Sequence, residues 1–412
     1  MRVLFTTFPW ASHHWPMVPT EWACRAAGHE VLVASTPALA PVVGATGLPF
    51  APVGGEIDLP AMSRGRRLAS WHTQGRWPEG WPVDPGLLRE DQVELLAGLG
   101  EMQTVMAAAM VDDLVALARE WRPDLVVHNT VSLAGPVAAA AVGVPSVSHH
   151  WGGPGPHQLE LRGLRGAPLP GYAALYERFG VPVRTHPDLW IDLCPPSMRL
   201  PMTVPYVSAR FVPFNGPGRV PPWVLERPQG RRICVTWGET TERLLGSEGL
   251  SVFRHAVSSA AELGAEVLVA TTASQVKRLG PLPDQVRPVL SLPLHLVLST
   301  CDLIVHHGGS GTAMTAVTCG VPQLAVPQRP EPELQGSALR SVGAGDYVRH
   351  ADLVAETDPA AVLRDRMSRM LSDPSYAHAA RELAEEVRGQ PAPADIVTNL
   401  CELAGRPRTP TE

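Results

Sequence analysis

The segment Ile304-Val305-His306-His307-Gly308-Gly309-Ser310-Gly311-Thr312 is the most informative part of this 412-residue sequence. Its β-branched apolar start predicts a buried strand. The glycines allow a sharp backbone turn, and the Ser and Thr that follow suit the first positions of a helix. Such a helix directs unpaired N–H groups and the positive end of its dipole at one spot, which favours phosphate. We therefore predict a diphosphate site at this turn, with the two histidines as further hydrogen-bond donors beside it.

Two other interpretations of this segment stay open on the residues alone. The glycines are also compatible with a tight strand-to-helix turn in which they serve only packing. A dinucleotide-binding fingerprint is matched less well. Gly309-Ser310-Gly311 supplies its first two glycines, but Met314 occupies the position of the third.

Composition and charge limit the classes of function. Apolar residues make up 45% of the chain and charged residues 18%, as expected for two or three globular domains with substantial cores. The net charge of −6 and the lack of a basic run argue against a nucleic-acid partner. We expect no signal peptide and no membrane span, because no apolar run approaches the roughly 18 residues that a span requires. Six scattered cysteines without a C-x-x-C pair predict the reducing cytoplasm and no metal site.

Apolar strands alternate with amphipathic helices along the chain, which predicts doubly wound parallel sheets. We expect strands at residues 2–8, 30–35, 124–128, 146–150, 232–237, 266–271, 286–292, 302–306 and 323–327. We expect helices at residues 17–27 and 91–121, and three more that start near residues 358, 376 and 394. A proline- and glycine-rich stretch interrupts the alternation. We therefore predict a first α/β domain (1–210), a linker (211–228), a second α/β domain (229–385) and a C-terminal helix (386–412).

Motifs in both halves of the chain occur in a characteristic order. The first half contains Ser12-His13-His14-Trp15-Pro16-Met17-Val18-Pro19 and Arg25-Ala26-Ala27-Gly28-His29-Glu30-Val31. The second half contains Val235-Thr236-Trp237-Gly238, the segment quoted above and Gly320-Val321-Pro322-Gln323. With this spacing, almost the whole chain resembles the actinobacterial antibiotic glycosyltransferases. These are inverting, nucleotide-sugar-dependent enzymes that transfer deoxysugars to polyketide and related aglycones. The resemblance implies the α/β GT-B fold, in which two Rossmann-like domains face each other across a cleft. It also implies that residues 1–210 form the acceptor-binding domain, that residues 229–385 form the nucleotide-sugar-binding domain, and that the helix at 386–412 crosses back to the N-terminal domain.

The resemblance also implies a donor site in the second half. The diphosphate of a dTDP-sugar would be bound by His306, Gly309, Ser310, Gly311 and Thr312. Gly238 and Thr240 would lie near the sugar-phosphate end, Ser291 near the nucleotide base and Glu331 at a sugar hydroxyl. Two of these positions depart from the family pattern. Ser291 replaces a stacking aromatic residue, and Pro332, which follows Glu331, replaces a residue that can donate a hydrogen bond.

In the first half, the resemblance implies that His13 is the general base. An imidazole is suited to take a proton from an acceptor hydroxyl near neutral pH. His14 is the competing candidate. The family orients its base with an Asp, and Asn129 stands in that place, so the base should be weaker. The helix N-terminus and His306 would meet the charge of the leaving diphosphate, so we expect no metal and no cofactor besides the nucleotide sugar.

Tryptophans and histidines predict a large, flat, apolar acceptor, although core packing is the alternative for each of them. The candidate acceptor contacts are Trp10, His14, Trp15, Trp71, His149 and Trp151. The function that fits best is transfer of a deoxysugar to an aromatic or polyketide-type aglycone. A catalytically silent homologue that assists another glycosyltransferase is the main alternative, and a nucleotide-sugar epimerase is a minor one. A homodimer or a helper protein is compatible with the sequence, which does not define the linkage formed.

Overall fold

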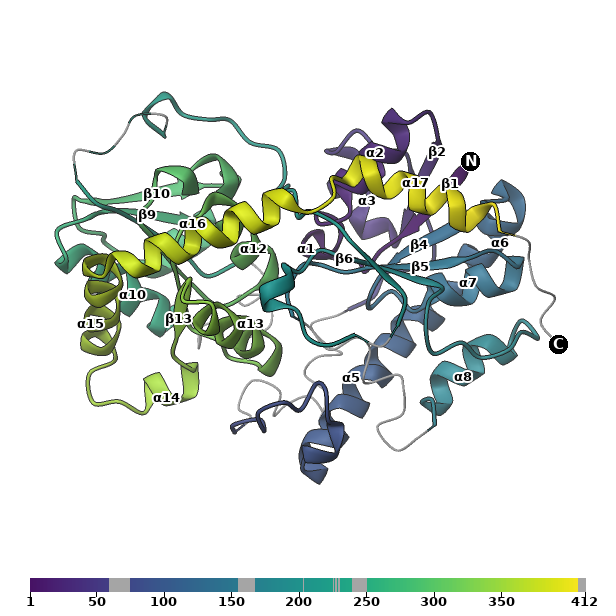
Figure 1. The fold of residues 1–412 in the computed structure, drawn as a ribbon, viewed down its shortest axis with the longest axis horizontal. Coiled ribbons are helices and arrows are strands. Elements are labelled where there is room, and N and C mark those ends of the chain that lie inside the picture. The colour runs from purple at the N-terminus through teal and green to yellow at the C-terminus, as the bar shows by residue number, and fades with distance from the viewer. Residues whose placement is uncertain are drawn as a thin grey trace.

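The computed structural model describes residues 1–58, 75–154, 167–202, 204–224, 226, 228, 230–238 and 250–406. It contains two entirely parallel sheets, each with helices on its faces (Figure 1). The prediction of a two-sheet, doubly wound α/β fold is therefore confirmed.

The first sheet, in spatial order, comprises β3 (Phe50–Pro52), β2 (Glu30–Ser35), β1 (Arg2–Thr6), β4 (Leu125–Asn129), β5 (Ser146–His149), β6 (Leu189–Asp192) and β7 (Tyr206–Ser208). The second comprises β10 (Val286–Leu290), β9 (Glu266–Thr271), β8 (Arg232–Thr236), β11 (Leu303–His306), β12 (Gln323–Ala325) and β13 (Gly345–Tyr347). The strand order reverses between β1 and β4 in the first sheet and between β8 and β11 in the second. At such switch points the loops after the strands diverge and leave a crevice for ligands.

The helices associated with the first sheet are α1 (Ala11–His14), α2 (Val18–Ala26), α3 (Ala40–Gly44), α5 (Glu90–Ala108), α6 (Val111–Trp121), α7 (Ala134–Val142) and α8 (Pro170–Glu177). Those that follow β8 are α10 (Leu250–Glu262), α11 (Ala273–Leu279), α12 (Ser310–Cys319), α13 (Pro330–Ser341), α14 (His350–Val354), α15 (Pro359–Ser372), α16 (Pro374–Gly389) and α17 (Pro393–Ala404). No helix in the described part of the chain is long and apolar enough to cross a membrane.

The last two helices connect the halves of the molecule. The yellow segment in Figure 1 shows α16 lying along α12 and α17 continuing onto α2. A single apolar cluster extends from Phe5 in β1 through Leu400 in α17 to Met314 in α12. The linker is also fixed, because the Asn215 side-chain amide donates to Thr315 Oγ1 at 3.1 Å and its oxygen accepts from the backbone N–H of His295 at 3.2 Å. The two halves thus share core and linker contacts.

The long helix predicted over residues 91–121 is wrong in one respect, because it is broken into α5 and α6 at Ala109 and Met110. The loop after β3 causes the break. Gly54 lies so close that a Cβ atom there would be 2.3 Å from the Ala109 carbonyl oxygen, and its N–H donates to Asp113 Oδ2 at 2.9 Å. The sequence analysis also missed the short strands β3, β6, β7 and β13.

Candidate active site between the two domains

The turn between β11 and α12 has the predicted form. β11 ends at His306, Gly308 has a φ of +88°, and α12 begins at Ser310 after Gly309. No side chain caps the N-terminus of α12, and Ser310, Gly311 and Thr312 are partly exposed. The first N–H groups of this helix are therefore available to an anion. The strand–turn–helix prediction is confirmed, whereas diphosphate binding stays a prediction.

His306 does not present the free hydrogen-bond donor that was predicted for the diphosphate. Its ring is fully buried, and Nδ1 accepts a hydrogen bond from the Gly308 N–H at 3.1 Å. The proton must then be on Nε2, which donates to Gln323 Oε1 at 3.1 Å. Burial lowers the pKa of His306 to about 4, so the ring is neutral at pH 7. Because both nitrogens bond within the protein, His306 holds the turn in shape and is not available to the diphosphate.

His307 lies at the carboxyl edge of the second sheet, in the position that was predicted for His306. Its ring lies between two glycines, and a Cβ atom would be 2.7 Å from it at Gly238 and 2.5 Å from it at Gly309. Its Nδ1 has no hydrogen-bond partner within the described residues. Burial, together with His306 and Arg329, lowers its pKa to about 3. Successive side chains of a strand point to opposite faces, so the two rings have different surroundings, and which ring is buried depends on where the strand ends.

His13 lies at the switch point of the first sheet and is fixed by Asn129 at the end of β4. Asn129 Nδ2 donates to the His13 carbonyl oxygen at 3.3 Å, and its Oδ1 accepts from the Val131 N–H at 3.3 Å. This orients the amide so that Oδ1, at 3.2 Å, faces His13 Nδ1. Nδ1 must then carry the proton, and the unprotonated Nε2 is left as the base.

Aromatic rings surround the partly exposed His13. Its ring centroid is 4.6 Å from that of Phe8, 5.6 Å from that of Trp151 and 6.1 Å from that of Trp10. Desolvation by burial lowers the pKa of His13 to about 4. The positive charge of Arg329 lowers this pKa further, whereas the hydrogen bond to Asn129 raises it. His13 is therefore neutral at pH 7 and presents its base on an apolar, aromatic surface.

The loop after β5 joins this surface to the α12 turn. Trp151 packs edge-on against His13. Two residues later, a Cβ atom at Gly153 would lie 2.5 Å from Gln335 Oε1 and 2.7 Å from Ser310 Oγ. Gln335 is fully buried, and neither its oxygen nor its nitrogen has a hydrogen-bond partner within the described residues. The first and second domains thus approach each other at Gly153.

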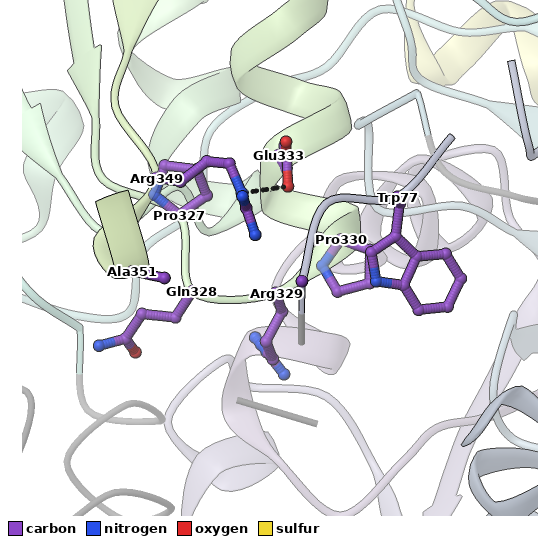
Figure 2. A pocket seen from close by; sticks show the side chains of 9 residues that line it. Trp77, Pro327, Gln328, Arg329, Pro330, Glu333, Arg349 and Ala351 are labelled. Carbon is purple, nitrogen blue, oxygen red and sulfur yellow. Dashed lines mark ion pairs between the residues drawn. The ribbon is translucent and has the colours of Figure 1, made fainter. Parts of the chain in front are cut away.

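Arg329, at the end of the loop after β12, and Glu331, in the first turn of α13, add two ionisable groups. Figure 2 shows the pocket at this loop, bounded by Trp77 on the other side, with an ion pair of 3.2 Å between Arg349 and Glu333. Arg329 points away from that pair, is partly exposed, and makes no ion pair or hydrogen bond within the described part of the chain. Burial raises the pKa of Glu331, whose Oε2 also lacks a hydrogen-bond partner there. The sequence analysis missed Arg329, although a basic residue just past a strand was a visible signal.

Two predicted acceptor contacts are corrected by burial. His14 is fully enclosed against Glu21, with Nδ1 and Oε1 3.5 Å apart, and cannot be the base. His149 is equally buried, and its Nε2 is 3.0 Å from Thr20 Oγ1. Neither ring reaches a surface that an acceptor could contact.

The remaining predicted site residues differ in exposure and in their distance from His13. Trp10 and Trp151 are partly exposed beside His13, whereas Trp15 lies beneath the linker, 3.1 Å from where a Cβ atom of Gly216 would be. Ser291 is exposed and has a φ of +51°. Trp71 and Thr240 lie outside the described residues.

Comparison with known proteins agrees with this arrangement. Residues 22–238 match the N-terminal domain model described as erythromycin biosynthesis protein CIII-like, and residues 254–403 match the corresponding C-terminal domain model. The chain is 35% identical over 442 residues to the aclacinomycin-T 2-deoxy-L-fucose transferase of Streptomyces galilaeus, covering 99% of this chain and 97% of that protein. It is 36% identical over 435 residues to the TDP-daunosamine transferase DnrS of Streptomyces peucetius, covering 100% and 98%.

A solved structure shows the same architecture. The crystal structure of glycosyltransferase VinC in complex with dTDP superimposes with a TM-score of 0.83 at 33% identity, covering 99% of this chain and 100% of that one. The two doubly wound domains are thus those of the GT-B fold. With matching domain models over both halves, the chain belongs to the erythromycin biosynthesis protein CIII-like family of antibiotic glycosyltransferases.

Proposed function

We propose that this glycosyltransferase moves a deoxysugar from a dTDP-sugar to an aromatic or polyketide-type aglycone in antibiotic biosynthesis, with inversion at the anomeric carbon. The observation that carries this proposal is the pairing of an oriented, neutral His13 on one domain with an uncapped helix N-terminus on the other. The relatives named above, which transfer 2-deoxy-L-fucose and TDP-daunosamine, support the donor class.

The proposed reaction places the donor on the second domain. The N–H groups at the start of α12, with His307 beside them, bind the diphosphate and stabilise the charge that it gains on leaving. Glu331 accepts a hydrogen bond from the sugar. Ser291 lies near the nucleotide base without stacking on it.

The acceptor lies on the first domain, against the aromatic residues around His13. His13 Nε2 takes the proton of the acceptor hydroxyl as its oxygen bonds to the anomeric carbon, and the bond from that carbon to the diphosphate breaks. The free thiols of all six cysteines support a reducing, cytoplasmic setting. A silent auxiliary role is not favoured, because Asn129 still orients His13. A homodimer or helper protein stays a prediction.

The proposal is tested by His13→Ala. With dTDP-deoxysugars and a panel of aglycones, release of dTDP and formation of the β- or α-glycoside opposite to the donor configuration are measured. Loss of a general base lowers kcat by about 10²–10⁴-fold. His378→Ala on α16, an exposed position, is the matched control and should act like the parent. A His13→Ala enzyme as fast as the parent contradicts the assignment, and retained anomeric configuration contradicts the mechanism.

A further inference from the structure

A pocket between the two halves borders the α12 turn but contains none of the residues assigned to the transfer reaction. It is the pocket of Figure 2, to which the first half contributes Gly75 and Trp77, and the second half contributes the loop after β12 with parts of α13 and α14. Pro327, on its wall, lies 3.6 Å from where a Cβ atom of Gly308 would be. The pocket is therefore a neighbour of the donor turn on the same inter-domain surface.

The wall from the first half is held in place from both sides. The carbonyl oxygen of Arg76 accepts a hydrogen bond from Arg89 Nη1 at 3.3 Å. The guanidinium of Arg76 forms an ion pair of 3.1 Å with Asp352 in the second half. Trp77 packs in an apolar cluster that also contains Leu334 of α13. Contacts from both halves thus define the shape of this pocket.

The charged side chains around the pocket leave one positive charge without a partner. Arg349 pairs with Glu333 at 3.2 Å and with Asp352 at 3.4 Å. Asp352 is shared with Arg76. Arg329, the third guanidinium, makes no ion pair or hydrogen bond with any residue that the structure describes, and Figure 2 shows it directed away from the Arg349–Glu333 pair. Positive charge is therefore in excess at this pocket.

Glu331 does not supply the missing negative charge to the pocket. Residues two apart on a helix do not share a face, and Glu333 lines the pocket whereas Glu331 does not. Burial raises the pKa of Glu331, although the charge of Arg329 opposes this. Gln328 also lines the pocket, and its side chain makes no hydrogen bond within the described part of the chain. A guanidinium and an amide are thus both available to an anion.

The size of the pocket decides which anion it suits. Its enclosed part holds about one water-sized group. A carboxylate head fits such a space, whereas a sugar ring or a phosphate ester does not. A guanidinium also matches a planar carboxylate with two parallel hydrogen bonds. Trp77, Pro327 and Pro330 surround the space with apolar surface, which suits a carboxylate attached to an apolar body.

We propose that this pocket binds a carboxylate group of the acceptor, held by Arg329 and Gln328, while the reacting hydroxyl of the same molecule lies at His13. This inference rests on the proposed function and adds a chemical group to the acceptor. Arg329 is a binding residue here and takes no part in proton transfer or in bond making. The carboxylate gives an acceptor seated on the first domain a second attachment, on the domain that holds the donor.

The test compares acids with their methyl esters, because esterification removes the charge and keeps the ring system. Hydroxyanthraquinones with one carboxyl group, at different ring positions, are assayed with one dTDP-deoxysugar. For at least one acid we expect KM to be about 10–10²-fold below that of its ester, with a similar kcat, because hydrogen bonds to charged groups are strong. This difference should shrink between about 0.05 M and about 0.5 M salt.

The possible results separate the inference from the proposed function. If every ester is used as well as its acid, the inference is overturned and the proposed function stands. Transfer to neither class counts against the proposed function. Isothermal titration of the acids and esters into the dTDP complex then decides the inference without turnover. Acids that bind no better than their esters overturn it.

Arg329→Gln isolates the role of the guanidinium. It should raise the KM of the acid to that of its ester, and leave the KM of the ester and the Kd of dTDP unchanged. Arg329→Lys should keep part of the preference for the acid, because the charge remains without the planar fork. Arg25→Gln, at an exposed position on α2, is the control and should keep the whole preference. A preference that survives Arg329→Gln, or a Kd of dTDP that rises with it, shows the inference to be wrong.

Free benzoate distinguishes a carboxylate of the acceptor from one on a separate small molecule. Benzoate should compete with the acid acceptor in the parent, leave transfer to the ester unchanged, and have no effect on Arg329→Gln. Stimulation of ester transfer by benzoate would mean that the pocket takes a free acid as an effector, and would overturn the inference.

Discussion

His306 and His307 are adjacent in the sequence but have different environments, and substitution should separate them. His306→Leu removes the acceptor of the Gly308 N–H and the donor to Gln323, and leaves both groups buried and unpaired. We expect the free energy of unfolding to fall by about 2–4 kcal/mol, since each unsatisfied buried group costs roughly 1–3 kcal/mol. Urea denaturation measures this loss. A variant that keeps its stability would show that the ring is not a structural tie.

His307→Ala should act on the donor instead. The ring bonds to no other group in the described part of the chain, but it lies between Gly238 and Gly309 at the α12 turn. We expect the Kd of dTDP to rise about tenfold, which corresponds to about 1.4 kcal/mol, with less loss of stability than in His306→Leu. Isothermal titration of dTDP gives the answer. Unchanged binding would remove His307 from the donor site.

Sequence reasoning predicted part of this site because local motifs define it. The turn after β11 and the His13 position follow from residue types at fixed spacing. The sequence pattern does not fix the last residue of β11 to within one position. It therefore does not decide which of the two neighbouring histidines is buried. Arg329 and Gln335 belong to the candidate site only because of residues in the opposite domain, His13 and Gly153, which are far away in the sequence. No local pattern carries that information.

At the scale of the element, the loop after β5 should control how the domains meet. An alanine Cβ at Gly153 would lie 2.5 Å from Gln335 Oε1 and 2.7 Å from Ser310 Oγ, so these side chains or the loop itself would have to move. We expect Gly153→Ala to lower kcat/KM about tenfold, because small displacements of reacting groups are costly. The Kd of dTDP should change less. Gly44→Ala, where a Cβ meets nothing within 4 Å, is the control, and equal activity of the two variants would contradict this role.

The elements that sequence patterns missed were missed for two physical reasons. The strands β3, β7 and β13 have three residues each, too few for a period of two to stand out. The break between α5 and α6 comes from the approach of Gly54, some fifty residues earlier in the chain, and the sequence at Ala109 contains no helix breaker. Long buried strands such as β1 and β9 were predicted well because their apolar runs are set by burial on both faces.

For the whole molecule, the two halves are joined by the close approach of the Gly153 loop to Ser310 and Gln335 and by the last helix of the chain. The first presents His13 and the second presents the α12 turn. α17 packs on α2, and Leu400 and Phe5 share one apolar cluster with Met314 of the second half. This shared core makes the stability of the two halves interdependent, so a perturbation of buried groups should be felt by the whole chain.

Acid should provide such a perturbation, because five histidines are buried in the part of the chain that the structure describes. Burial lowers the pKa of His14, His128, His149 and His306 to about 4, and that of His150 to about 3. In the unfolded chain these histidines bind protons below about pH 6.5, whereas in the folded protein they stay unprotonated until the pH approaches 4. Stability is therefore fully present above about pH 6.5. It is lost as the pH falls toward 4, by up to about 1.4 kcal/mol per pH unit for each group.

We expect Tm to fall steeply between pH 7.5 and 5.0, as measured by differential scanning calorimetry. Glu21 opposes this trend, because burial raises its pKa in the folded state and its contribution to stability grows as the pH falls. His14→Met fills the buried position with an apolar side chain and removes one titrating group, so the pH dependence of Tm should become shallower. A parent Tm that is the same at pH 5.0 and 7.5 would mean that folding does not lower the pKa values of these rings, and would contradict the prediction.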